Sequence, residues 1–105
     1  MRFVETKVFS RVIADLITDD EYRALQTALI TRPHLGAVIP NGGGVRKVRW
    51  SIPGRGKRGG ARVIYFWEAE PEVFFMLYAY PKNERDDLSP AQLRALRRLA
   101  ELEFS

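Results

Sequence analysis

The sequence predicts an α+β domain with a mostly antiparallel sheet. Three segments rich in β-branched and aromatic residues follow one another closely at 45–50, 61–67 and 72–80. A helix-start signal precedes them at Thr18, and another follows them at Ser89. Short connections between successive strands favour antiparallel pairing, because parallel neighbours need a long crossover. The predicted element order is β-α-α-β-β-β-α, with the helices packed on the sheet.

The first half of the chain supplies one strand and two helices. Residues 2–9, RFVETKVF, have alternating and β-branched character that predicts a strand, and residues 10–17 predict a short helix. A second helix starts at Thr18, because Thr18 and Glu21 have the spacing of a capping box. It ends before Pro33, which disfavours a helical residue in front of it. Its buried stripe is predicted to consist of Tyr22, Leu25 and Leu29.

The second half begins with a turn-rich loop, IPNGGG at 39–44, before the three strands. The strands at 61–67 and 72–80 are apolar on both faces, which suits central strands. In the strand at 45–50, the period of two places Lys47 and Arg49 on one face. The other face receives Arg46, Val48 and Trp50. A closing helix is predicted from a capping box made by Ser89 at the N-cap, Pro90 at N1 and Gln92 at N3.

The composition limits the class of protein. A chain of 105 residues, 46% of them apolar, is expected to form a single domain spanning residues 1–105. Without cysteine it has no disulfide, thiolate metal site or thiol nucleophile. No apolar run approaches the roughly 20 residues of a membrane span, and no secretory signal is evident at the N-terminus. We expect a cytoplasmic protein that does not bind membranes.

Charge is segregated along the chain. Residues 23–67 contain nine arginines and lysines and no acidic residue, although the net charge of the whole chain is only +4. The remaining residues carry 8 basic and 13 acidic side chains. A local positive field concentrates polyanions, so nucleic acid is the first partner to consider. A solvated basic surface without a partner is the alternative.

The stretch PGRGKRGGARVIYFW, residues 53–67, contains three glycines with the G-x-G-x-x-G spacing of a dinucleotide-binding turn. That fingerprint requires a helix after the glycines, whereas a β-branched, aromatic strand follows them here. A Walker A motif is absent too, because Arg58 follows Lys57. We therefore predict no nucleotide cofactor. The glycines are interpreted as spacers that let Arg55, Lys57 and Arg58 reach along a polyanion, with a solvated hairpin loop as the alternative.

Two other candidate sites are weak. His34 is the only histidine, so a nuclease with two catalytic histidines is excluded within one chain, and a solvated loop histidine is favoured. Glu84, Asp86 and Asp87 precede the last helix and are interpreted as a polar lead-in to its N-terminus. A two-metal site would need acids from several elements, so no metal is predicted.

A set of cations and hydroxyls remains on the predicted strands. If the strands are neighbours, these groups could converge on one face and stabilise the charge of a phosphodiester transition state. A general base is missing from the set, although a lysine placed among other cations has a lowered pKa and could supply one. The set consists of Lys47, Arg49, Arg62, Tyr65, Tyr80 and Lys82.

The element order, the RKVR strand, the GKRGGARVIYF segment and the YPKNERDDLS segment together resemble the RelE/HigB group of bacterial toxins, closest to its HigB-like branch. The resemblance covers nearly the whole chain and implies the RelE-like fold. It implies a metal-independent mRNA interferase that cuts the message in the ribosomal A site by attack of a 2′-hydroxyl. The implied partners are the ribosome, mRNA and a HigA-like helix-turn-helix antitoxin.

The resemblance also suggests roles for individual residues. The catalytic cations of the family fall on Lys47, Arg49 and Arg62, and its basic residue after the last strand falls on Lys82 or Asn83. Some relatives use a tyrosine near the C-terminus, but no tyrosine follows Tyr80. Proton transfer is therefore left open among Lys82, Lys57 and Tyr80. RNA or ribosome contacts are expected from Arg46, Arg55, Arg58, Tyr65, Tyr80 and Asn83.

Two alternative functions fit the same residues. One is the ParE-like branch of the fold, which poisons gyrase and has no nuclease activity. The other is an RNA-binding module without catalysis, for which binding would weaken steeply with salt.

Overall fold

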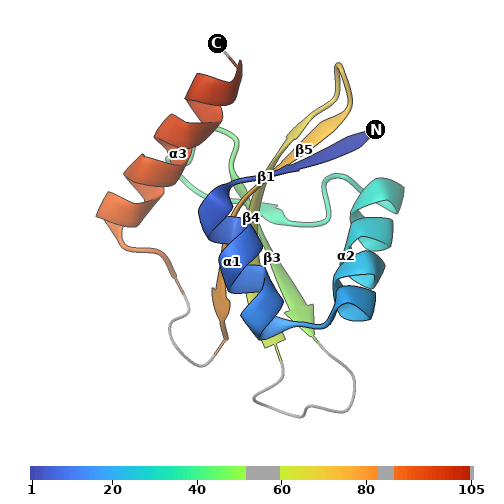
Figure 1. The fold of residues 1–105 in the computed structure, drawn as a ribbon. Helices are drawn as coiled ribbons and strands as arrows, with labels where there is room; N and C mark the ends of the chain where they lie inside the picture. Colours follow the sequence, from blue (N-terminus) through green and yellow to red (C-terminus); the bar gives the residue numbers. More distant parts are fainter. Residues whose placement is uncertain (52–59, 83–86, 105) are drawn as a thin grey trace.

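The structure is a computed structural model that describes residues 1–51, 60–82 and 87–104. Its elements confirm the α+β class and the three consecutive strands (Figure 1). An additional two-residue strand, β2, precedes those three strands. In chain order the elements are β1 (Arg2–Glu5), α1 (Lys7–Leu16), α2 (Asp19–Thr31), β2 (Ala37–Val38), β3 (Arg46–Ser51), β4 (Gly60–Glu68), β5 (Val73–Pro81) and α3 (Pro90–Phe104).

The strands form one sheet in the order β1-β5-β4-β3-β2. β1 pairs with β5 in parallel, and the other three pairings are antiparallel. β4 and β5 are central, as the apolar sequences of both strands predict. The pairing between them shifts register at Ile64 and Tyr65, which is a β-bulge.

Helices cover both faces of this sheet. α1 and α2 pack on one face, where Phe9, Ile13, Leu25 and Leu29 are buried against β4 and β5. α3 packs on the other face through Leu96 and Ala100. Figure 1 shows α3 at the left and α2 at the right, with the strands between these two helices. Successive side chains of a central strand therefore point alternately into the core under α1 and α2 and toward the face covered by α3.

The predicted first strand at 2–9 is too long. The strand ends at Glu5, and Thr6 is the N-cap of α1. The Thr6 hydroxyl accepts a hydrogen bond from the Phe9 N–H at 3.0 Å and donates one to the Leu77 carbonyl at 2.9 Å. The cap satisfies a free N–H of the first helical turn and ties the start of α1 to β5. The hydrogen bonds of Thr6 therefore start α1 inside segment 2–9, although the residues of that segment favour a strand.

Replacing Thr6 with alanine should lower the free energy of unfolding by about 1–2 kcal/mol, because a helix cap and a hydrogen bond to β5 are both lost. Thr6→Ser keeps the hydroxyl and should recover most of the stability. Chemical denaturation of the three proteins checks this prediction. Equal stability of the alanine and serine variants would contradict it.

Both predicted capping boxes are present. The Thr18 hydroxyl accepts from the Glu21 N–H, and the Glu21 carboxylate accepts from the Thr18 N–H at 2.7 Å. The same reciprocal pair joins Ser89 and Gln92 at the start of α3. Among the described residues, no helix is long and apolar enough to cross a bilayer.

Candidate functional site

A row of polar side chains crosses three strands on the face of the sheet that α3 covers. Arg49 of β3 lies opposite Arg62 of β4, and Arg62 lies opposite Tyr80 of β5. Ile64 of β4 and Tyr80 belong to the core on the α3 side, which identifies the face. The antiparallel register thus brings together residues that are up to 31 positions apart in the sequence.

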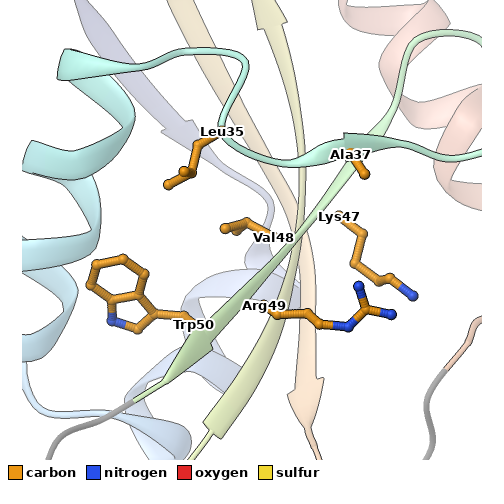
Figure 2. A pocket seen from close by; sticks show the side chains of 6 residues that line it. All are labelled: Leu35, Ala37, Lys47, Val48, Arg49 and Trp50. Atoms are coloured by element: carbon orange, nitrogen blue, oxygen red, sulfur yellow. The ribbon is translucent and has the colours of Figure 1, made fainter.

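Lys47 and Lys82 extend this row at its two ends. Lys47 is two residues before Arg49 on β3, and Figure 2 shows both side chains directed to the same side of that strand. Leu35, Val48 and Trp50 point to the other side (Figure 2). Lys82 follows β5, and its N–H donates to the Gly60 carbonyl at 3.1 Å. We call Lys47, Arg49, Arg62, Tyr80 and Lys82 the strand cluster.

Arg62 lies at the centre of the strand cluster. It is only 8% exposed, and it is the one buried charged residue among the described residues. Its Nε atom makes no hydrogen bond to the described residues, although other interactions hold the side chain. Tyr80 beside it is 2% exposed, whereas Arg49 and Lys82 are exposed to solvent. The cluster therefore combines a sheltered guanidinium with cations that an external anion can reach.

Asp87 joins the strand cluster from the segment that leads into α3. Its Oδ1 lies 2.7 Å from the Lys47 Nζ. This hydrogen bond and the charge of Lys47, followed by the charges of Arg49 and Arg62, lower the pKa of the Asp87 carboxyl. All three cations thus act on one carboxylate. The interpretation of Asp87 as only a polar lead-in to the helix missed this contact.

Two hollows lie beside Lys47. One of about 320 Å³ follows β3 and is lined by the six residues labelled in Figure 2, among them Arg49 and Trp50. The other, of about 220 Å³, lies between the segment after β2 and the start of α3, with Asp87 and Leu88 in its lining. Both hollows have Lys47 in their lining, so they border the strand cluster.

A family model described as the RelE toxin of the RelE/RelB toxin-antitoxin system matches residues 1–105. The chain belongs to the RelE toxin family. The match includes every residue of the strand cluster. At the level of the toxin family, it confirms the resemblance that the sequence predicted. The protein is therefore the toxin of a toxin-antitoxin system, and its expected partner is an antitoxin. The assignment to the HigB-like branch stays a prediction.

Tyr65 of this toxin does not belong to the strand cluster, so the prediction that it shares a face with Arg62 is wrong. It is fully buried in the core on the α1 and α2 side. Its hydroxyl donates to the Pro33 carbonyl at 2.8 Å and accepts from the Gly36 N–H at 2.9 Å. Burial raises the pKa of this hydroxyl, so it remains a donor. Tyr65 supports the loop before β2 and has no access to RNA.

Arg46 and His34 hold the same loop. The Arg46 guanidinium donates to the Gly36 carbonyl at 2.8 Å, and its other nitrogen lies 2.8 Å from the His34 Nδ1. Because an arginine nitrogen can only donate, the His34 Nδ1 must accept. His34 is exposed, as predicted, but it is engaged with Arg46. Arg46 is only partly exposed, so its predicted contact with RNA would compete with these bonds.

Replacing Tyr65 with phenylalanine should lower the free energy of unfolding by about 1–3 kcal/mol, because the buried Gly36 N–H and the partly buried Pro33 carbonyl lose their partner. Tyr78→Phe is a matched control, since Tyr78 is a half-buried tyrosine on the opposite face. Thermal unfolding should show a clearly lower Tm for the first variant only. Equal shifts for both variants would contradict the role given to Tyr65.

Four other predicted site residues lie outside the described part of the chain. They are Arg55, Lys57, Arg58 and Asn83. Their assigned roles stay predictions.

Proposed function

We propose that this toxin is a ribosome-dependent endoribonuclease that cuts translated mRNA in the A site and so inhibits translation. The observation that carries the proposal is the strand cluster, in which Arg49 and Arg62 lie opposite each other and Lys47 and Lys82 extend the row. Toxin family membership supports it, because a toxin must act on an essential process. The basic segment at 23–67 supports binding to ribosomal and messenger RNA.

The proposed reaction is an internal phosphoryl transfer. The 2′-oxygen of one nucleotide attacks the adjacent phosphorus, its proton leaves to a base, and the bond to the 5′-oxygen breaks. The products are a 2′,3′-cyclic phosphate and a new 5′-hydroxyl, which takes up a proton. Negative charge grows on the phosphoryl oxygens in the transition state, and positioned cations stabilise it most strongly where water is excluded. The buried Arg62 is best placed for that role, with Lys47 and Arg49 beside it. No resident metal or cofactor is required for these steps.

Among the residues considered for proton transfer, the placement favours Lys82. Lys82 is exposed at the end of β5, and a Cβ added at Gly60 on β4 would lie 3.4 Å from its Cδ. Tyr80 is 2% exposed and lies opposite Arg62 in the interior of the cluster, whereas Lys82 is open to solvent at its end. We assign proton transfer to Lys82, with Lys57 as a further candidate, and binding of the phosphate to the other cations.

The proposed partners follow from this reaction. The single-domain toxin would enter the ribosomal A site of a translating ribosome in the cytoplasm. A HigA-like helix-turn-helix antitoxin would hold it inactive. Arg55, Arg58 and Asn83 would add contacts to RNA around the strand cluster.

The experiment adds purified toxin to a translation extract and maps the message by primer extension. We expect cuts within translated codons, and none when ribosomes are removed. Intact message with normal translation would refute the proposal. Cleaved DNA in growing cells with intact message would instead indicate a gyrase-poisoning toxin, and RNA binding without growth arrest would indicate a non-catalytic binding module.

A further inference from the structure

The contact between Asp87 and Lys47 is strongly asymmetric. The Lys47 side chain is 11% exposed, whereas that of Asp87 is 80% exposed. Most of the Lys47 side chain is thus covered by the fold, and its Nζ is contacted at 2.7 Å by a carboxylate whose own side chain is largely open to solvent.

Asp87 is held in this position by the residues that follow it. Leu88 is partly buried against the core on the α3 side, and Ser89 caps α3 through its bond with Gln92. Leu88 and Asp87 both line the hollow between the segment after β2 and α3. The packing of Leu88 and the cap of α3 therefore fix the backbone next to Asp87. The short Asp87 side chain reaches Lys47 from that fixed backbone.

We propose that Asp87 is an internal competitor of the RNA phosphate, which neutralises Lys47 in the free toxin and is displaced when RNA binds. The inference rests on the proposed function only in taking the strand cluster as the site that binds RNA. A carboxylate carries the same charge as a phosphodiester and accepts the same hydrogen bonds from a lysine. The carboxylate already takes one of the three Nζ donors at 2.7 Å, and its negative charge both neutralises Lys47 and repels a second anion at the same nitrogen.

The exposure of Asp87 makes the displacement feasible. Ion pairs that include an exposed group are weak, so a polyanion with several phosphates can replace the carboxylate. Asp87 therefore lowers the affinity of the strand cluster for any anion. An RNA chain offsets this loss of affinity because it makes further contacts with the toxin. Asp87 would favour long polyanions over single phosphates.

The direction of the pH dependence follows from the lowered pKa of Asp87. Above the ordinary carboxyl pKa the ion pair with Lys47 is fully formed, and it is lost as the pH falls through the lower pKa of the folded protein. Binding of RNA should raise the pKa of Asp87, because Lys47 then pairs with the phosphate and the bound RNA adds negative charge.

The test uses the full chain and a fluorescent 2′-O-methyl oligoribonucleotide, which cannot be cut by a 2′-hydroxyl. Asp87→Asn should bind this probe about threefold more tightly than wild type in anisotropy titrations at moderate salt. Asp15→Asn is the matched control, because it removes the same charge from α1 on the other face of the sheet and should bind as wild type does. Thermal unfolding checks that both variants are folded.

A second measurement follows the Asp87 carboxyl carbon by NMR as the pH is changed. In wild-type toxin the pKa should rise when the probe is bound. Equal affinities of the Asp87→Asn and Asp15→Asn variants, weaker binding by Asp87→Asn, or an unchanged carboxyl pKa with saturating probe would each overturn the inference. Neither readout involves cleavage, so the two proposals can fail separately. If Asp87→Asn binds the probe more tightly but the message stays intact in the translation extract, the nuclease proposal is refuted and the competitor role of Asp87 is supported.

Discussion

Replacing Arg62 with alanine should lower the rate of mRNA cleavage on translating ribosomes at least about 100-fold, because Arg62 is the sheltered cation at the centre of the strand cluster. A buried guanidinium stabilises developing charge more strongly than an exposed one, since less water screens it. The loss should lie mainly in the rate of the chemical step, while the affinity for the ribosome changes little.

Single-turnover cleavage of a defined message bound to purified ribosomes measures this effect. Arg94→Ala is the matched control, because Arg94 is an exposed arginine on α3 outside the strand cluster. Arg62→Lys keeps the charge but loses the planar fork of donors, so it should recover only part of the rate. Near wild-type cleavage by a folded Arg62→Ala toxin would show that the central cation is not part of the chemistry.

The second large effect is expected for Lys82. Replacing Lys82 with alanine should lower the cleavage rate about 100-fold, which is typical for loss of a group that transfers a proton. Lys82→Arg keeps the positive charge and hydrogen-bond donors, but an arginine does not release its proton in proteins. A proton-transfer role thus predicts that both variants are slow, whereas a purely electrostatic role predicts that the arginine variant is active.

Single-turnover cleavage of the same ribosome-bound message should be compared for wild type, Lys82→Ala and Lys82→Arg. A slow Lys82→Arg toxin would support proton transfer by Lys82. Full activity of Lys82→Ala would move the assignment to another group, and Lys57→Ala would then be the next variant to measure.

Much of this fold follows from local sequence signals. The boxes at Thr18 and Ser89 start helices through bonds within four residues, so the sequence contains all the required information. The strands at 61–67 and 72–80 are apolar on both faces, which places them at the centre of the sheet before any pairing is known. Such features need no knowledge of distant residues.

Other features depend on contacts between distant segments. The start of α1 is fixed by Thr6, whose hydroxyl bonds to Leu77 on β5. The two residues of β2 show no pattern of their own, and Gly36 before them fits because a Cβ there would lie 2.8 Å from the Tyr65 ring. The sequence alone does not place Leu77 or Tyr65 beside these segments.

The candidate site was predicted in part for the same reason. Lys47 and Arg49 were placed on one face by the period of two, and the register of β3 and β4 then brought Arg62 to them. The same period places Arg62 and Tyr65 on opposite faces of β4, as the structure has them. Asp87 reaches Lys47 across 40 positions in the chain, and no local pattern indicates that contact.

The most direct test of the proposed activity replaces the attacking 2′-hydroxyl in the message. A message with one 2′-deoxynucleotide on the 5′ side of the cleaved phosphate is translated on purified ribosomes with the wild-type toxin. We predict that cleavage stops at that phosphate, and that the unmodified message gives a 2′,3′-cyclic phosphate and a 5′-hydroxyl. Undiminished cleavage at the deoxynucleotide, or ends with a 5′-phosphate, would contradict a mechanism in which the strand cluster promotes attack by the 2′-oxygen.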